Sequence, residues 1–199
     1  MTQWIDPSIR RYSDPGGLIQ AWIAVLTQPR QFFRESVVPG EQASSLLFAM
    51  VVVAISEATR ILLVPDAVPV VAGMPILSAV FWLGVAVLLV TPLALHLIAA
   101  LQTILLIPFV SNRGGISETV QVLAYATAPC VLVGIPIPEL QALVVLWGFF
   151  LLTLGISEVH GTLFEPAAVL SALPAALVFG YGFRGFTALE TVLRGWYII

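Results

Sequence analysis

The sequence contains no lysine, a single cysteine and few charged residues of either sign. Only 10% of its 199 residues are charged, against about 25% in a typical soluble domain. This is too little charge to coat a water-soluble globule, which excludes a cytosolic enzyme and a disordered chain. The lone Cys130 cannot form an internal disulfide, which excludes a disulfide-stabilised secreted scaffold. A net charge of −3 gives no reason to expect nucleic-acid binding, which needs a basic surface.

Apolar residues dominate what remains. They make up 59% of the chain, and the mean hydropathy is +1.03. At about 20 residues per helical crossing, the length allows roughly four to six transmembrane helices and no separate soluble domain. The first forty residues are polar and rich in arginine, so no cleavable signal peptide is expected. We therefore expect an all-α, polytopic membrane protein.

Prolines, glycines and charged residues divide the apolar sequence into five stretches. These predict a five-helix transmembrane bundle over residues 42–182, with spans at about 42–64, 76–107, 116–134, 139–156 and 166–182. The second stretch is longer than a bilayer core of about 30 Å requires, so we expect one long helix, tilted or kinked at Pro92. Residues 1–41 are expected to form a cytoplasmic tail with an interfacial helical segment, and residues 183–199 an interfacial C-terminal tail.

An odd number of spans places the two termini on opposite sides of the membrane. One predicted face carries five arginines, four in the N-terminal tail and Arg113 in a loop, whereas the other carries only Arg184 and Arg194. Cytoplasmic loops hold an excess of Lys and Arg. We expect a multi-pass protein of the cell membrane with its N-terminus in the cytoplasm and its C-terminus outside.

Two phenylalanines flanked by arginines precede the first predicted span. This pattern, Arg30, Phe32, Phe33 and Arg34, is typical of a membrane-interface anchor, with the rings in the lipid boundary and the arginines among the headgroups. The alternative is a helix packed on the bundle itself, because an amphipathic pattern alone does not separate the two.

Ionisable residues inside predicted spans are costly and are the candidates for function. Glu57 and Arg60 are three residues apart in the first span, so they share one helical face and can form a pair. Such a pair either joins this helix to a neighbour or belongs to a functional site.

A larger set of polar residues converges on the predicted cytoplasmic ends of the spans. Glu118, Gln121 and Tyr125 follow one helical face, and the antiparallel fourth span brings Glu158 and His160 to the same side. The full candidate cluster is Arg113, Glu118, Gln121, Tyr125, Glu158, His160 and His96. It either serves as hydrogen-bonding contacts between helices or relays protons or a cation. No metal site or cofactor is expected, because no ligand pair has the spacing of a known metal-binding helix.

Templates for catalysis are missing from the sequence. It has no GxSxG, no HExxH, no phosphate-binding GxxxxGK and no lysine for a Schiff base. No catalytic residue is therefore expected, and we expect the protein not to be an enzyme.

Three segments, in order, resemble a known family. They are TQPRQFF at 27–33, SETVQVLAYATAPCVL at 117–132 after a Gly-Gly loop, and GISEVHG at 155–161 before an Ala-rich last span. Together they resemble the Yip (Ypt/Rab-interacting protein) domain family of five-pass membrane proteins, over about residues 17–182. The resemblance implies five helices, a cytoplasmic N-terminus and a non-catalytic role. Eukaryotic members work with small GTPases, but this chain lacks their long N-terminal region and is more similar to short prokaryotic members, so a small-GTPase partner is doubtful.

The sequence is compatible with two functions. The first is a membrane-shaping or partner-binding component that contacts the lipid bilayer and other membrane proteins or itself. The second is a small-solute or ion transporter or channel, in which the Glu and His cluster forms the pathway for protons or cations.

Overall fold

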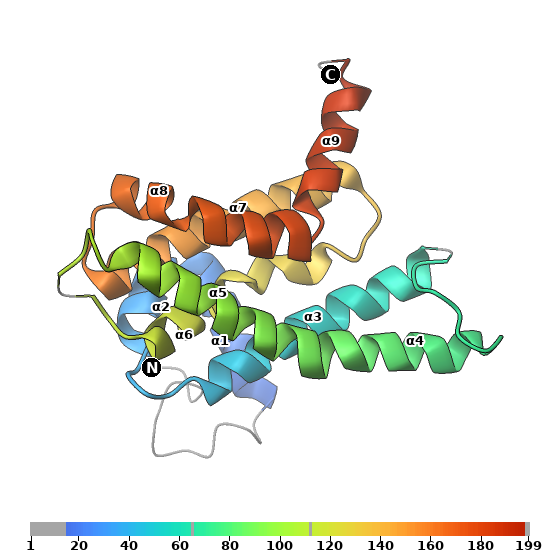
Figure 1. Ribbon diagram of the computed structural model, residues 1–199, viewed down its shortest axis with the longest axis horizontal. Helices are drawn as coiled ribbons and strands as arrows, with labels where there is room; N and C mark the ends of the chain where they lie inside the picture. Colours follow the sequence, from blue (N-terminus) through green and yellow to red (C-terminus); the bar gives the residue numbers. More distant parts are fainter. Residues whose placement is uncertain (1–14, 65, 112, 198–199) are drawn as a thin grey trace.

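The computed structural model describes residues 15–64, 66–111 and 113–197, which form helices joined by loops and contain no strand (Figure 1). The predicted tail 1–14, with Arg10 and Arg11, lies outside the described residues. In chain order the elements are α1 (Pro15–Thr27), α2 (Pro29–Ser36), α3 (Ala43–Leu63), α4 (Pro75–Gly84), the π-helical η2 (Val85–Val90), α5 (Thr91–Leu106), α6 (Ile116–Ala126), the 3₁₀-helical η3 (Ala128–Leu132), α7 (Pro138–His160), α8 (Phe164–Ala175), the π-helical η4 (Ala176–Gly182) and α9 (Gly185–Gly195).

Four helical stretches are long and apolar enough to cross a membrane. They are Ala43–Leu63, Pro75–Leu106, Pro138–His160 and Phe164–Gly182. Three of these helices begin and end within two residues of an expected span, and α7 continues four residues beyond the expected end at 156. The membrane boundaries themselves stay a prediction. The chain is an all-α, multi-pass membrane protein, as the hydropathy pattern predicts.

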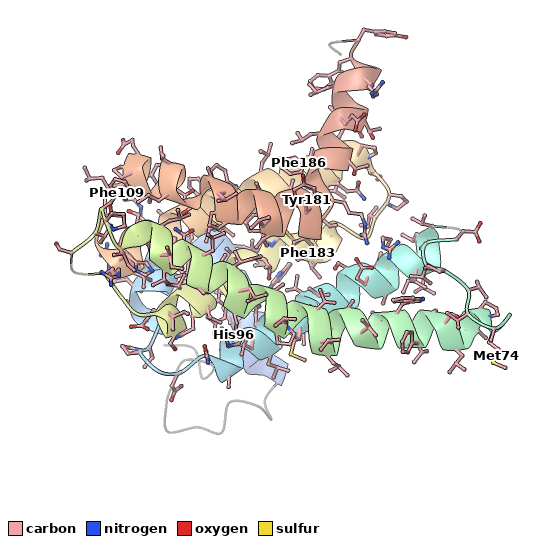
Figure 2. All side chains as sticks on the ribbon, viewed as in Figure 1. Met74, His96, Phe109, Tyr181, Phe183 and Phe186 are labelled. Atoms are coloured by element: carbon pink, nitrogen blue, oxygen red, sulfur yellow. The ribbon has the colours of Figure 1, made fainter. Side chains whose placement is uncertain are left out.

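The long second stretch is interrupted at the proline that the sequence singled out. η2 ends two residues before Pro92, and α5 continues the helix from there. Proline donates no backbone hydrogen bond and crowds the preceding turn, so the turn ahead of it widens. The Ala86 carbonyl in that turn accepts from the Thr91 backbone N–H and also from Thr91 Oγ1, the latter over 2.7 Å. The α3–α4 hairpin extends beyond the other helices in Figure 1, and Met74 lies at its tip in Figure 2.

The predicted third span is a shorter apolar helix, Ile116–Leu132. It consists of α6 followed by η3, which begins just before Pro129, and every residue from 119 to 130 is buried in the protein. It runs in the same direction as α3, because Tyr125 packs on Phe48 and Gly134 packs against the backbone of Ser56. That this central segment crosses the membrane stays a prediction.

The last stretch also contains a π-helical turn that follows a proline. Pro174 lies inside α8, and the helix continues as η4. Arg184 then adopts a left-handed conformation with φ of 57°, which ends the stretch and turns the chain into α9. In Figure 1, α9 projects away from α7 and α8 at a steep angle. This direction is compatible with the predicted interfacial tail, and its position in the membrane stays a prediction.

The two phenylalanine rings of α2 pack inside the protein. Phe32 and Phe33 of α2 are only 3% and 1% exposed, and Phe32 lies edge-on to Tyr125 with ring centroids 4.8 Å apart. Gly155 of α7 makes room for Phe33, because a Cβ there would lie 3.1 Å from the Phe33 ring. The prediction that these two rings anchor in lipid is wrong, and the alternative of a helix packed on the bundle is correct. The sequence pattern could not decide, since lipid and protein cores are equally apolar.

Candidate functional site

Charged side chains gather at two opposite ends of the bundle. We call the end that holds α2, the start of α6 and the end of α7 the Arg34 end. We call the end that holds the last turn of α3, the start of α7 and the start of α9 the Arg184 end. The candidate cluster from the sequence lies mostly at the Arg34 end, and the Glu57–Arg60 pair lies at the Arg184 end.

Glu158 at the Arg34 end pairs with α2. Arg34 donates from both Nε and a terminal nitrogen to Glu158 Oε2, over 3.3 and 2.6 Å, and Arg30 lies 3.8 Å from the other carboxylate oxygen. The hydrogen bond and charge of Glu158 raise the pKa of Arg34 above its ordinary value. The Arg34 side chain is 70% exposed and that of Glu158 is 14% exposed. Arg34 thus joins α2 to the end of α7 by hydrogen bonds, and Arg30 lies near the same carboxylate without a hydrogen bond to it.

Gln121 binds the backbone that connects α2 to α3. Its Oε1 accepts from the Val38 N–H over 3.0 Å, and its Nε2 donates to the Val38 carbonyl over 2.7 Å. Nε2 also donates to the Ser117 carbonyl over 3.3 Å. Tyr125, one turn further along α6, is buried between the rings of Phe32 and Phe48. The predicted polar face of this helix therefore points into the protein, where each residue meets a different neighbour.

His160, the last residue of α7, is fully buried. Its Nε2 lies 3.3 Å from Thr119 Oγ1, which in turn lies 3.2 Å from Thr103 Oγ1 of α5. These three side chains form a polar row across α5, α6 and α7. Arg113 and Glu118 lie close enough for their charges to act on the histidine ring.

Glu118 and His96 occupy separate places. The Glu118 carboxylate lies against Gly115, the residue that precedes α6, where a negative charge is favoured by the helix dipole. The Nδ1 atom of His96 lies 2.7 Å from the Pro92 carbonyl of its own helix. His96 is seven residues from Thr103, which puts it about 10 Å further along α5, and Figure 2 shows it near the middle of that helix. No group of three or more His, Cys, Asp or Glu able to hold a metal is present within the described residues.

The predicted Glu57–Arg60 pair forms at the Arg184 end. Arg60 donates to Glu57 Oε2 from two nitrogens, over 2.9 and 2.7 Å. Arg184 donates to the other carboxylate oxygen over 3.0 Å, and Arg60 also donates to the Ala67 carbonyl over 2.6 Å. Glu57 is therefore shared by two guanidinium groups and joins α3 to the turn before α9.

Sequence reasoning missed three of these contacts. Arg184 is 127 residues from Glu57, and no local spacing connects them. Thr103 and Thr119 carry no signal, because threonine is common in apolar helices. The Arg34–Glu158 contact had a usable signal, since the predicted topology already placed both side chains at the same end of the bundle.

Comparisons with known proteins give one match. A family model described as the Yip1 domain matches residues 23–183, which is most of the chain. The search of curated proteins found no match, and neither did the search of solved structures. The matched range begins within α1 and ends one residue before Arg184, so it covers both ends of the bundle.

Proposed function

Because the chain belongs to the Yip1 domain family, we propose that it is a non-enzymatic membrane protein that binds other membrane proteins or a second copy of itself and helps to shape the bilayer around it. The membrane location follows from its four long apolar helices. The molecular role is the part that we propose.

One observation carries this proposal: polar side chains at the Arg34 end are used in separate, short links between segments. Arg34 and Glu158 join α2 to α7, Gln121 joins α6 to the backbone at Val38, and Thr119 links His160 to α5. Polar side chains in membrane bundles commonly serve as such interhelical contacts. This use of the cluster supports a structural role for it.

The long helix offers a surface for a partner. Only 11% of the most apolar window of Pro75–Leu106 is buried within the protein, against 56% for Pro138–His160. Large apolar side chains of α4 are exposed, namely Ile76, Leu77, Val80 and Phe81. In a membrane such a face contacts lipid, and a second transmembrane helix can take the place of that lipid by van der Waals packing.

We further propose that the protein lies in the cell membrane with the Arg34 end in the cytoplasm. The positive-inside rule supports this orientation. The arginines assigned to the cytoplasmic face are Arg10, Arg11, Arg30, Arg34 and Arg113, and those assigned to the outer face are Arg184 and Arg194.

A second candidate function, a proton or cation pathway, is favoured by a different observation. Within the described residues, His160 Nδ1, Gln102 Oε1 and Ser171 Oγ are buried without a hydrogen-bond partner. Buried polar atoms of this kind are where water or a proton could enter a bundle. The two candidates make opposite predictions for flux through the protein.

Site-specific photo-crosslinking tests the partner-binding role. A photoreactive residue is placed at Leu77 on α4 in native membranes, and a matched control is placed at Val169 on α8, which is also apolar and at least as exposed. We expect protein adducts of discrete mass at Leu77 and lipid adducts alone at Val169. Lipid adducts alone at both positions would contradict the proposal.

A further inference from the structure

A cavity of about 460 Å³ opens at the Arg184 end, between α3, η2, α5 and η4. Most of its wall is apolar and comes from side chains such as Val53, Trp82, Ile98 and Leu177. Glu57, Arg60 and Arg184 also line it, and they are the three residues that share hydrogen bonds at that end. The volume lies within the roughly 300–1,000 Å³ of pockets that hold small molecules.

The depth of the cavity matches one half of a bilayer. Along α3 its lining runs from Ala49 to Ile61, and a rise of 1.5 Å per residue over this range spans about 18 Å. A bilayer core is about 30 Å thick, so this is about the depth of one leaflet. The charged end lies beside the 66–74 loop and the start of α9, where the protein leaves the apolar part of its spans.

The charges at the mouth favour an anion. Two guanidinium groups face one carboxylate, which leaves one positive charge in excess. The Arg184 side chain is 40% exposed, so its donors can reach a second acceptor. Guanidinium groups bind phosphate oxygens in a planar, two-pronged geometry that lysine does not provide.

Both π-helical turns border this cavity. Val85, Ala86 and Val90 of η2 line one side, and Leu177 and Val178 of η4 line the other. π turns inside α-helices are rare and often mark functional sites. Here the two turns line the same cavity.

We propose that this cavity binds one acyl chain of an anionic phospholipid, whose phosphate binds Arg184 and Arg60 in competition with Glu57. The apolar wall holds the chain, and the excess positive charge selects the headgroup. The inference is independent of the proposed partner surface, because α4 presents that surface through other side chains.

Native mass spectrometry of the full-length chain in detergent tests the proposal. The probe is palmitoyl-oleoyl phosphatidylglycerol, and palmitoyl-oleoyl phosphatidylcholine is the neutral comparison. We expect phosphatidylglycerol to be retained in preference, and Arg184→Gln to weaken its binding by roughly tenfold, since a charge-assisted hydrogen bond is lost. Arg194→Gln is the matched control. Arg194 pairs with Glu190 on α9 and does not line the cavity, so this substitution removes the same charge at a distance from the proposed site.

Two further variants separate lipid binding from general damage. Glu57→Gln removes the competing carboxylate and is expected to strengthen phosphatidylglycerol binding, whereas a loss of folding would weaken it. Ala94→Phe fills the cavity from α5, keeps every charge, and is expected to abolish retention of the lipid. Equal losses for Arg184→Gln and Arg194→Gln, full retention in Ala94→Phe, or a protein dimer in place of a lipid adduct would overturn the proposal.

Discussion

Arg34 of α2 and Glu158 of α7 are 124 residues apart in the chain and are joined by a 2.6 Å hydrogen bond. The contact joins the N-terminal segment to the end of α7, the third of the four long apolar helices. It also neutralises the carboxylate that would otherwise be the best candidate for a cation site at this end. The structural interpretation of the polar cluster depends largely on this pair.

The first prediction is that the Arg34–Glu158 contact limits local unfolding of α2. Arg34→Gln removes the short hydrogen bond, so the backbone amides of α2 should exchange hydrogen several-fold faster in detergent-solubilised protein. The overall unfolding midpoint should move little, because exposed ion pairs add little global stability. Hydrogen-exchange mass spectrometry measures both effects when it is combined with a thermal scan.

Arg30→Gln is the matched control for this experiment. Arg30 lies 3.8 Å from Glu158, beyond hydrogen-bond distance, so its loss should leave exchange in α2 nearly unchanged. If both variants speed hydrogen exchange in α2 equally, then α2 is held by the net positive charge of its arginines and not by the specific Arg34–Glu158 hydrogen bond.

The second prediction concerns close packing between α7, α6 and α2. A Cβ at Gly155 would lie 2.6 Å from Val122 Cγ1 and 3.1 Å from the Phe33 ring. Gly155→Ala should therefore lower the free energy of unfolding by about 1–3 kcal/mol, as overpacking does. Gly84→Ala should have the opposite sign and stabilise by up to about 1 kcal/mol, because nothing lies within 4 Å of a Cβ there.

Unfolding titrations with sodium dodecyl sulfate in mixed micelles measure both glycine variants under the same conditions. Equal effects of the same sign would show that α7 does not approach α6 and α2 as closely as described.

The third prediction concerns the Gln121 contact with the α2–α3 connection. Gln121→Leu leaves the N–H and C=O of Val38 without their present partners, which should lower the free energy of unfolding by about 1–3 kcal/mol. Gln31→Leu removes an exposed 3.2 Å contact with Glu35 on α2 and should change it by less than about 0.5 kcal/mol. The same detergent titration compares the two, and equal losses would contradict a special role for Gln121.

The long helices were predictable because hydrophobic length is a property of the local sequence. The ends of α3 and of the long second stretch fall within one residue of their predicted positions. The Glu57–Arg60 pair was predictable for a similar reason, since residues three apart on a helix are neighbours. The irregular turn of the long second stretch lies directly before Pro92, where the sequence predicted a tilt or a kink, but the sequence did not indicate that this turn would be π-helical.

The contacts that define the candidate site were harder to predict. Phe32 and Phe33 have the same apolar pattern whether they face lipid or Gly155, and only the packed structure distinguishes the two. Arg184 reaches Glu57 through a left-handed turn that no residue preference indicates, since arginine is not a residue that favours positive φ. Such contacts depend on tertiary packing between distant segments.

The measurement that tests the central claim most directly is ion flux through reconstituted protein. Proteoliposomes containing the wild-type chain are compared with empty liposomes across a panel of pH gradients and monovalent and divalent cations. Glu118→Gln and Glu158→Gln are measured beside the wild type. A structural cluster predicts no flux above that of empty liposomes for any of the three proteins. Flux through the wild type that either substitution abolishes would contradict the account and establish the cluster as a pathway.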